Sequence, residues 1–330
     1  MTTDAPPLLD VRDLRITFSL PGRLIHAVRG ITFEVRGGER IGVVGESGSG
    51  KSATALAIMR LLPRSTAVTG QILLDGVDLL QLSSKEIRTI RGRAIGIVYQ
   101  DPFTALNPVL TVGQQVAEVI SRHFGTPRQA ARREAANLLL RVGISSAADR
   151  LDDYPHQFSG GMRQRVMIAI ALAGRPRLII ADEPTTALDV TIQAQILELL
   201  LTLTQEDNTA LLLITHDLAV IARAIERVNV MYAGHIVEQA DTRTVFKRPN
   251  HPYTNALLSS LPRVDDPSSS FTAIAGQPPD PSRPDTGCPY VDRCDRPLSY
   301  CADRFPGLDR TDPYGSSANR VACWNPVNTQ

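Results

Sequence analysis

The sequence lacks any long apolar run, and it has almost no net charge. No segment approaches the roughly 18 consecutive apolar residues that a membrane-spanning helix needs, and residues 1–7 carry no basic stretch followed by an apolar core. We therefore expect a chain that stays in the cytosol. The 35 basic and 34 acidic residues leave a formal charge of +1, so no global field marks a nucleic-acid binder. Any anion site must be local.

Lysine and cysteine are scarce as well. Only three of the 35 basic residues are lysines, and Lys51 is the one embedded among glycines. All four cysteines lie in the last 43 positions, which is unlike the disulfide framework of a small secreted protein. They are Cys288, Cys294, Cys301 and Cys323. The length of 330 residues predicts about two domains, and 43 % hydrophobic residues predict a folded chain.

Short apolar runs alternate with longer amphipathic stretches from residue 8 to about 261, which predicts an α/β fold with a mostly parallel sheet. Residues 9–35 instead alternate apolar and polar positions, as an antiparallel sheet does, and residues 113–142 have a helical composition. Polar residues directly follow each predicted buried strand, where open α/β sheets bind ligands. These strands are residues 41–44, 95–98, 178–181 and 211–214.

The composition changes after about residue 262 to Pro, Asp, Ser, Gly and Arg. This predicts one domain at residues 1–262 and a small Cys-rich domain at residues 263–330. The second has too little aliphatic content for a core of its own, so we expect a cross-link or a metal. The spacing Cys-x5-Cys-x6-Cys-x21-Cys lacks the tight pairs of zinc ribbons. The residues alone leave zinc, an iron–sulfur cluster, free thiols and disulfides open.

A glycine-rich loop follows the first predicted buried strand and precedes a predicted helix, which is the context of a phosphate-binding loop. Its backbone N–H groups would surround phosphate oxygens, aided by the helix N-terminus. Lys51 would reach the β and γ phosphates, and the Ser52 hydroxyl would bind Mg²⁺. The alternative is a flexible turn with an exposed lysine. The loop comprises Gly45, Glu46, Ser47, Gly48, Ser49, Gly50, Lys51 and Ser52.

The other predicted buried strands end in residues suited to nucleotide hydrolysis. Asp182 would hold Mg²⁺, and Glu183 would polarise the attacking water. His216 would contact the γ phosphate, and the Gln100 amide would touch Mg²⁺ or water without adding charge. Each also has a plainer alternative, such as a solvated strand end for the acids or a helix cap for His216.

Residues 158–165 have the sequence FSGGMRQR and lie about 22 residues before the Asp182-Glu183 pair. With the loop, they resemble the signature motif of ABC (ATP-binding cassette) ATPases. The resemblance implies a P-loop NTPase core with an antiparallel β subdomain and a helical subdomain at about 101–165. It also implies a dimer in which each ATP lies between one loop and the other chain's signature. There, Ser159, Gly160 and Gly161 would bind the γ phosphate.

The resemblance assigns further roles residue by residue. Phe18 matches the aromatic residue that stacks on adenine, with an ordinary strand hydrophobe as the alternative. Asp189 matches the D-loop. Gln100, Glu183 and His216 match the Q-loop glutamine, the catalytic base and the switch histidine. The sequence departs from the family pattern in the signature motif, where Phe158 and Met162 replace the usual Leu and Gln, both peripheral to the Ser-Gly-Gly segment.

Residues 154–165, 182–195 and the His-Pro-Tyr-Thr segment 251–254 resemble the ATPase subunits of oligopeptide, dipeptide and nickel importers. This implies a peripheral protein on the cytoplasmic face of the cell membrane that energises peptide import. Its implied partners are two transmembrane permease subunits, an extracytoplasmic substrate-binding protein and a second ATPase subunit, related but different. No nucleic acid is expected. Residues 101–110 would lie near the groove for the permease's coupling helix.

Other classes fit less well. The alternatives within transport are an importer of nickel or another small solute. Soluble ABC ATPases of DNA repair or chromosome organisation insert long coiled coils or zinc modules between the loop and the signature motif, and the 108 residues from Lys51 to Ser159 are too few for a long coiled coil. Glu183 and His216 argue against a nucleotide-binding regulator without turnover. Similar tails in oligopeptide importers imply a 4Fe-4S cluster at the four cysteines, with zinc as the alternative and a structural or regulatory role.

Overall fold

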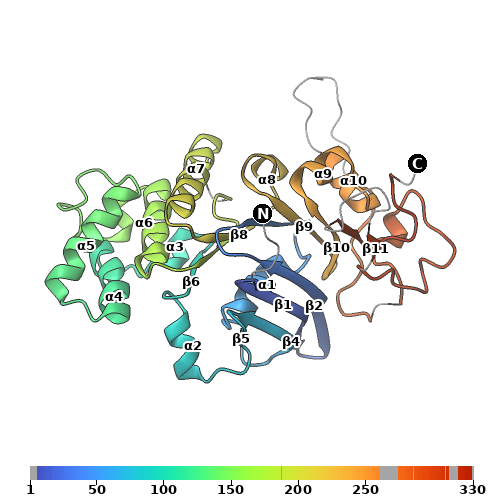
Figure 1. The fold of residues 1–330 in the computed structure, drawn as a ribbon, viewed down its shortest axis with the longest axis horizontal. Helices are drawn as coiled ribbons and strands as arrows, with labels where there is room; N and C mark the ends of the chain where they lie inside the picture. The colour runs from blue at the N-terminus through green and yellow to red at the C-terminus, as the bar shows by residue number, and fades with distance from the viewer. Residues whose placement is uncertain are drawn as a thin grey trace. The chain divides into compact units, whose positions relative to one another are not determined.

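The computed structural model describes residues 6–186, 188–260, 274–284, 286–308, 310–311 and 319–328 (Figure 1). The chain forms two compact units, and each gathers segments that are far apart in the sequence. The first unit comprises Met1–Pro7, Val35–Arg40 and Gln81–Ile214. The second unit comprises Leu8–Glu34, Ile41–Leu80 and Thr215–Gln330.

The sheet of the first unit consists of three parallel strands in the order β6-β7-β8. They are β6 (Ile95–Val98), β7 (Leu178–Asp182) and β8 (Ala210–Ile214). Val98 pairs with Ala181, and Asp182 pairs with Ile214. The carboxyl ends of the three strands therefore share one edge. Every residue of β7 and β8 is buried, as the continuous apolar runs predicted.

Helices form the rest of the first unit. They are α2 (Ser84–Ile90), α3 (Pro102–Ala105), α4 (Val112–Phe124), α5 (Arg128–Arg141), the 3-10 helix η1 (Pro155–Gln157), α6 (Gly160–Ala173) and α7 (Val190–Glu206). The single helical stretch expected at 113–142 is two helices, because Gly125 ends α4 in the left-handed region at φ 64° and Pro127 precedes α5. Both helices pack against α6. The buried residues of α4 recur every four positions, as Val116 and Ile120 do, so they lie on one face of the helix.

The second unit contains an antiparallel sheet in the order β2-β1-β4-β5, as expected for residues 9–35. These strands are β1 (Leu9–Leu20), β2 (Arg23–Val35), β4 (Thr66–Leu74) and β5 (Val77–Asp78). It also contains helices α1 (Lys51–Ile58), α8 (Leu218–Ala224), α9 (Thr242–Lys247) and α10 (Pro252–Ser259), and the 3-10 helix η2 (Val291–Arg293).

Five further strands of the second unit lie in the order β11-β12-β10-β9-β3. They are β3 (Arg40–Val44), β9 (Arg227–Tyr232), β10 (His235–Asp241), β11 (Arg310–Thr311) and β12 (Arg320–Val321). Only β3 with β9 is parallel, so the expectation of a mostly parallel sheet is wrong here. The reason is the tight turn at Ala233 and Gly234, both with positive φ, which returns the chain as a hairpin rather than through a helix.

The Cys-bearing tail packs within this second unit. Strand β12 pairs with β10, and the buried Glu238 of β10 accepts hydrogen bonds from the backbone N–H groups of Asn250 and His251. The separate Cys-rich domain is therefore not confirmed, and its expected boundary near residue 262 lies outside the described residues. Among the helices of the described ranges, none combines the length and apolar content needed to cross a membrane.

Shortening a buried leucine of β8 should destabilise the fold. Leu212 has no exposed surface, so Leu212→Ala should cost about 3 kcal/mol of unfolding free energy through lost burial and a cavity. The matched control is Leu140→Ala on α5, where the side chain is 62 % exposed and the cost should stay below about 0.5 kcal/mol. Urea unfolding followed by circular dichroism measures both. Equal destabilisation of the two variants would contradict the assignment of β8 to the core.

Candidate functional site

The glycine-rich loop joins β3 to α1 in the second unit, as the sequence predicted. The Lys51 side chain, in the first turn of α1, is buried, and its residue is only 4 % exposed. Its Nζ donates hydrogen bonds to the backbone oxygens of Gly45 at 2.8 Å and Glu46 at 2.9 Å. The lysine thus folds back over the loop and brings its positive charge to the place where the loop amides and the α1 N-terminus also concentrate positive potential.

Glycine is required at two positions of this loop. Gly50 caps α1 at φ 103°, and a Cβ there would lie 2.4 Å from the Ala27 backbone oxygen. Gly45 has φ 152°, and a Cβ would lie 2.1 Å from the Met231 backbone oxygen. Both the dihedral angle and the close backbone approach exclude a side chain. The two glycines therefore allow the loop backbone to follow a path that residues with side chains could not follow.

Two side chains distant in the sequence hold Glu46, the second residue of the loop. The Tyr253 hydroxyl, on α10, accepts a hydrogen bond from the Glu46 backbone N–H at 2.8 Å. Arg293, in the Cys-bearing tail, donates to both carboxylate oxygens of Glu46, at 2.8 and 3.0 Å. Burial raises the pKa of the Tyr253 hydroxyl, so this side chain stays neutral beside the ion pair.

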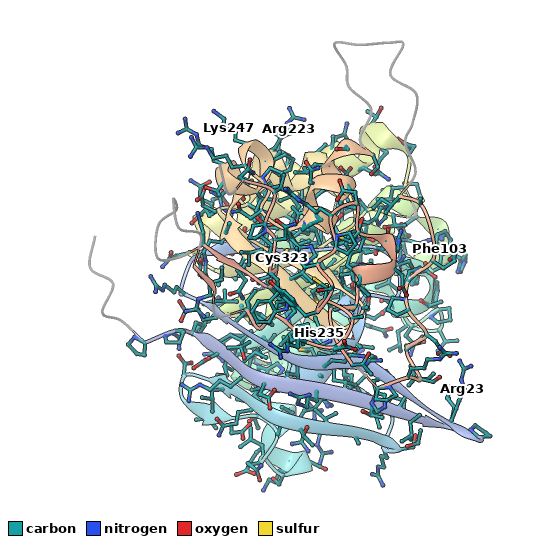
Figure 2. All side chains as sticks on the ribbon, turned by 90° about the vertical axis from the view of Figure 1, so that its right-hand side faces the viewer. Arg23, Phe103, Arg223, His235, Lys247 and Cys323 are labelled. Carbon is teal, nitrogen blue, oxygen red and sulfur yellow. The ribbon has the colours of Figure 1, made fainter. Side chains whose placement is uncertain are left out.

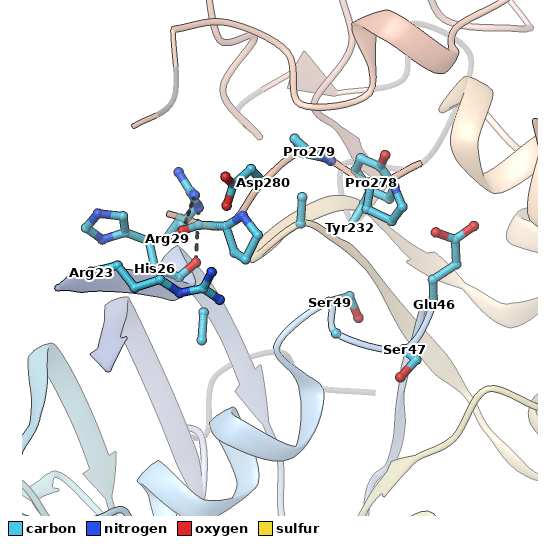
Figure 3. A pocket seen from close by; sticks show the side chains of 14 residues that line it. Arg23, His26, Arg29, Glu46, Ser47, Ser49, Tyr232, Pro278, Pro279 and Asp280 are labelled. Atoms are coloured by element: carbon cyan, nitrogen blue, oxygen red, sulfur yellow. Dashed lines mark hydrogen bonds between the residues drawn. The ribbon is translucent and has the colours of Figure 1, made fainter. Parts of the chain in front are cut away.

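A cavity of about 410 Å³ adjoins the loop within the second unit (Figure 3). The loop contributes residues 46–49 to it, and the end of the β1–β2 hairpin contributes Arg23, His26 and Arg29. The tail closes one side with residues 278–281, and the Arg29 guanidinium donates to the Pro281 backbone oxygen at 3.1 Å. The volume lies in the range of small-molecule sites, and three basic side chains line it.

In the first unit, the structure brings together two predicted residues. The Gln100 Nε2 donates to the Glu183 Oε2 at 3.1 Å, and the Thr186 hydroxyl donates to the same oxygen at 3.0 Å. This follows from the register of β6 and β7, since both residues lie just beyond the shared carboxyl edge. Glu183 has φ 46°, in the left-handed region that non-glycine residues rarely adopt. Such strain is typical of functional positions.

The predicted signature motif begins α6. Ser159 caps this 14-residue helix and accepts a hydrogen bond from the Met162 N–H, and its own side chain is exposed. Gly161 is needed for packing, since a Cβ would lie 2.8 Å from Ile192. Phe158 is only 3 % exposed and lies under the Arg150 guanidinium, whose carbon is 4.2 Å from the ring centroid. Phe158, which replaces the leucine usual in the signature motif, is therefore part of the core of the first unit.

The structure distributes the remaining predicted residues over both units. Asp182 ends β7 in the first unit and is 9 % exposed, while Asp189 caps α7 by accepting from the Ile192 N–H at 3.0 Å. In the second unit, the exposed His216 directly precedes the α8 cap. Phe18 lies half-buried on β1 and is not among the residues that line the cavity beside the loop.

The four cysteines converge on one small cavity in the second unit. All four line it, none forms a disulfide, and the enclosed space is about 10 Å³, roughly enough for one water molecule. The backbone N–H groups of Leu298 and Asn325 donate to the sulfurs of Cys301 and Cys323, each at 3.4 Å. In Figure 2, Cys323 lies among neighbouring side chains, whereas Arg223 and Lys247 point outward. The disulfide alternative is therefore wrong.

Three of the four thiols, those of Cys288, Cys294 and Cys323, have a raised pKa because they are buried. Burial raises the pKa of Cys288 to about 11 and that of Cys323 to about 12, with the neighbouring cysteines adding to both shifts. Thiolates would need a cation for their charge to be stable here. Across the described residues, which include all four cysteines, no group of three or more His, Cys, Asp or Glu side chains is arranged to hold a metal. The predicted iron–sulfur cluster is not confirmed.

Comparison with known proteins decides the family. Residues 28–186 match the family described as "ABC transporter", and residues 237–301 match the "Oligopeptide/dipeptide transporter, C-terminal region". The chain is 47 % identical over 319 residues to the dipeptide transport ATP-binding protein DppD of Bacillus subtilis, covering 96 % of this chain and 94 % of that protein. The chain belongs to the ABC transporter ATP-binding proteins. The resemblance seen in the sequence is thus confirmed.

Other relatives agree with this ABC ATPase assignment. The oligopeptide transport ATP-binding protein OppD of Salmonella typhimurium is 46 % identical over 320 residues, which cover 97 % of this chain and 94 % of that protein. Among solved structures, the dimeric ATP-binding cassette MJ0796 bound to ADP and Pi has a TM-score of 0.64 at 29 % identity, over 71 % of this chain and 99 % of that one. CbiO1 from Clostridium perfringens has a TM-score of 0.62 at 30 % identity, over 74 % and 92 %.

Sequence reasoning missed the residues that hold the phosphate loop of this ABC ATPase from outside. In the sequence, Tyr253 stands out only as part of the His-Pro-Tyr-Thr segment, and nothing singles out Arg293. They lie 207 and 247 positions from Glu46, so no local pattern could pair them with the loop. The one available signal was Glu46 itself, an acidic side chain inside a loop built for phosphate.

Replacing Gly50 should disable the loop. Gly50→Ala places a Cβ against the Ala27 backbone oxygen, so we expect ATP affinity to fall by about tenfold or more. The matched control is Gly22→Ala in the β1–β2 turn, where φ is 78° but nothing lies within 4 Å of the added Cβ. It should bind ATP as the native chain does. Titration with a fluorescent ATP analogue measures both, and an unaffected Gly50→Ala would show that the loop tolerates a side chain.

Proposed function

We propose that this chain is the ATP-hydrolysing subunit of an importer for peptides. The observation that carries the proposal is the match of residues 237–301 to the C-terminal region of oligopeptide and dipeptide transporters, together with relatives named for dipeptide and oligopeptide transport. The remaining expected partners are two permease subunits, a substrate-binding protein outside the membrane and a second ATPase chain. The protein would then work on the cytoplasmic face of the membrane.

The site residues take these roles in the proposal. The loop, with Lys51 and Ser52, binds the phosphates and Mg²⁺ of ATP; the loop's buried lysine and its glycine-dependent path support this. Glu183 is the base that orients the attacking water, and Gln100 holds its carboxylate; their 3.1 Å hydrogen bond supports this. Asp182 binds Mg²⁺, and His216 contacts the γ phosphate. The ATP bound to the second chain is contacted by Ser159, Gly160, Gly161 and Asp189. Phe18 stacks on the adenine of the ATP bound to its own chain.

Two exposed apolar side chains support the permease partner. Phe103 on α3 is 61 % exposed and Val109 is 75 % exposed, both in the segment expected to receive the coupling helix. The Arg163 guanidinium lies over the Phe103 ring, 4.1 Å from its centroid. Large apolar side chains exposed together mark interaction surfaces. We infer that residues 101–110 form the permease contact.

Transport tests the proposal directly. We expect the chain, reconstituted in liposomes with its permease subunits, companion ATPase and binding protein, to take up a labelled peptide only when ATP is present. Glu183→Gln should retain ATP binding but lose hydrolysis and uptake, because the amide cannot accept the water proton. The control is Glu198→Gln on the exposed face of α7, which should transport normally. Uptake of nickel instead of peptide would favour the alternative solute, and full hydrolysis by Glu183→Gln would remove its role.

We further propose that the four cysteines hold a cofactor, a 4Fe-4S cluster with zinc as the alternative, within a Cys-rich region at residues 263–330. All four cysteines line one cavity, and backbone N–H groups donate to two of the sulfurs, which supports this donor set. As they lie in the described part of the chain, the thiols are not arranged to hold a metal and would have to rearrange around it. The small enclosed space means that loading requires the side chains to move apart, less so for zinc than for a cluster. Such a cofactor would supply a cross-link for the tail, with no step in ATP hydrolysis.

Metal analysis of anaerobically purified protein distinguishes the two cofactors. A cluster predicts about four irons and four sulfides per chain with broad thiolate-to-iron absorption in the visible. Cys301→Ser should lose that absorption, because it removes one ligand. Zinc at about one per chain without iron would establish the alternative. The proposal of a cofactor would be refuted if the protein contained neither iron nor zinc and if a thiol reagent modified all four cysteines once the chain was unfolded.

A further inference from the structure

Arg293 uses its whole guanidinium to join the tail to the phosphate loop. An arginine has five N–H donors, and each finds an acceptor here. Two donate to the Glu46 carboxylate and one to the Tyr232 hydroxyl at 3.2 Å. The other two donate to the backbone oxygens of Ala275 at 2.9 Å and Ile274 at 3.2 Å. The Arg293 side chain is 4 % exposed and the Glu46 side chain 25 % exposed, so the pair is half-buried and every guanidinium donor is bonded.

Aromatic packing fixes the segment that carries Arg293. Tyr290, two residues after Cys288, meets the Tyr232 ring edge-on at 5.2 Å and the Tyr253 ring at 5.5 Å. Tyr253 is the residue whose hydroxyl accepts the Glu46 backbone N–H. The tail thus holds the Glu46 side chain through Arg293, and through Tyr290 it packs against the tyrosine that holds the Glu46 backbone. Arg293 itself directly precedes Cys294, so the loop is attached between two of the four cysteines.

Electrostatics explains why Glu46 needs this partner. It is the one acidic side chain of the loop, and a free carboxylate there would repel the phosphates that the loop amides and Lys51 attract. Figure 3 shows its carboxylate pointing away from the Ser47 and Ser49 hydroxyls. The bidentate contact with Arg293 both neutralises the charge and keeps it in that orientation.

We propose that Arg293 is a positioning residue through which the Cys-bearing segment holds the phosphate loop ready for nucleotide. It contacts neither ATP nor the reacting atoms; it acts by neutralising and orienting Glu46. The proposal rests on ATP binding at the loop, which belongs to the proposed function. Displacement of the segment around Cys288 and Cys294 would release Glu46 and weaken ATP binding.

A double-mutant cycle tests this assignment. Arg293→Met keeps most of the buried stem but removes the donors, and it should weaken binding of a non-hydrolysable ATP analogue by about tenfold or more. In a Glu46→Gln background, the same substitution should cost about twofold or less, because no carboxylate is left to repel phosphate. Arg293→Lys keeps the positive charge but loses the bidentate hydrogen bonds of the guanidinium, so its loss of ATP affinity should lie between those of the native chain and Arg293→Met. Thermal melting confirms that each variant is folded.

The matched control is Arg296→Met, two residues beyond Cys294. Arg296 donates to the Val327 backbone oxygen at 3.3 Å. A general disturbance of the cysteine region would weaken ATP binding in both variants, whereas the proposal predicts a loss only for Arg293→Met.

Hydrogen exchange of residues 45–51 without nucleotide gives a second readout. Exchange should rise in Arg293→Met and in Arg293→Lys, and stay native in Arg296→Met. This measurement keeps the proposal testable even if the native chain bound no ATP, an outcome that would overturn the proposed function instead. Equal affinity losses in both Glu46 backgrounds, or native affinity and native loop exchange in Arg293→Met, would overturn the role of Arg293.

Discussion

The phosphate loop can form only if its backbone passes through regions closed to most residues. Gly45, Gly48 and Gly50 have φ values of 152°, 79° and 103°, and two of them lie too close to neighbouring backbone oxygens to carry a side chain. The loop ends in α1, so the positive potential of the helix N-terminus lies at the end of the loop. The buried Lys51 and the contacts at Glu46 all presuppose this path.

Much of this arrangement follows from local pattern in the sequence. The apolar runs at 41–44, 95–98, 178–181 and 211–214 are strands, and the polar residues after two of them, Gln100 and Glu183, meet because parallel strands end at a common edge. Gly125 and Pro127 mark the break between α4 and α5, but the helical composition on both sides of them predicts one continuous helix. The hairpin of β9 and β10 could not be predicted, because its turn at Ala233 and Gly234 lies in a region where strands otherwise alternate with helices.

Contacts over long sequence separations could not be predicted in the same way. Arg293 and Tyr253 reach Glu46 across 247 and 207 positions, and nothing in their neighbours distinguishes them from ordinary tail and helix residues. The position of the tail also depends on strand β12, which pairs with β10, and on the hydrogen bond from the Val327 N–H to the Asn250 backbone oxygen. The change in composition near residue 262 predicts a separate domain for the tail, whereas the described residues of the tail belong to the same unit as the loop.

Glu183 occupies a backbone conformation that suits glycine better than glutamate. A glutamate at φ 46° costs about 1–3 kcal/mol relative to a relaxed backbone, a sum that glycine or asparagine would largely recover. Stability alone would therefore favour losing the carboxylate. The residue at this position is therefore set by what its side chain contacts, Gln100 and Thr186, and not by the stability of the backbone.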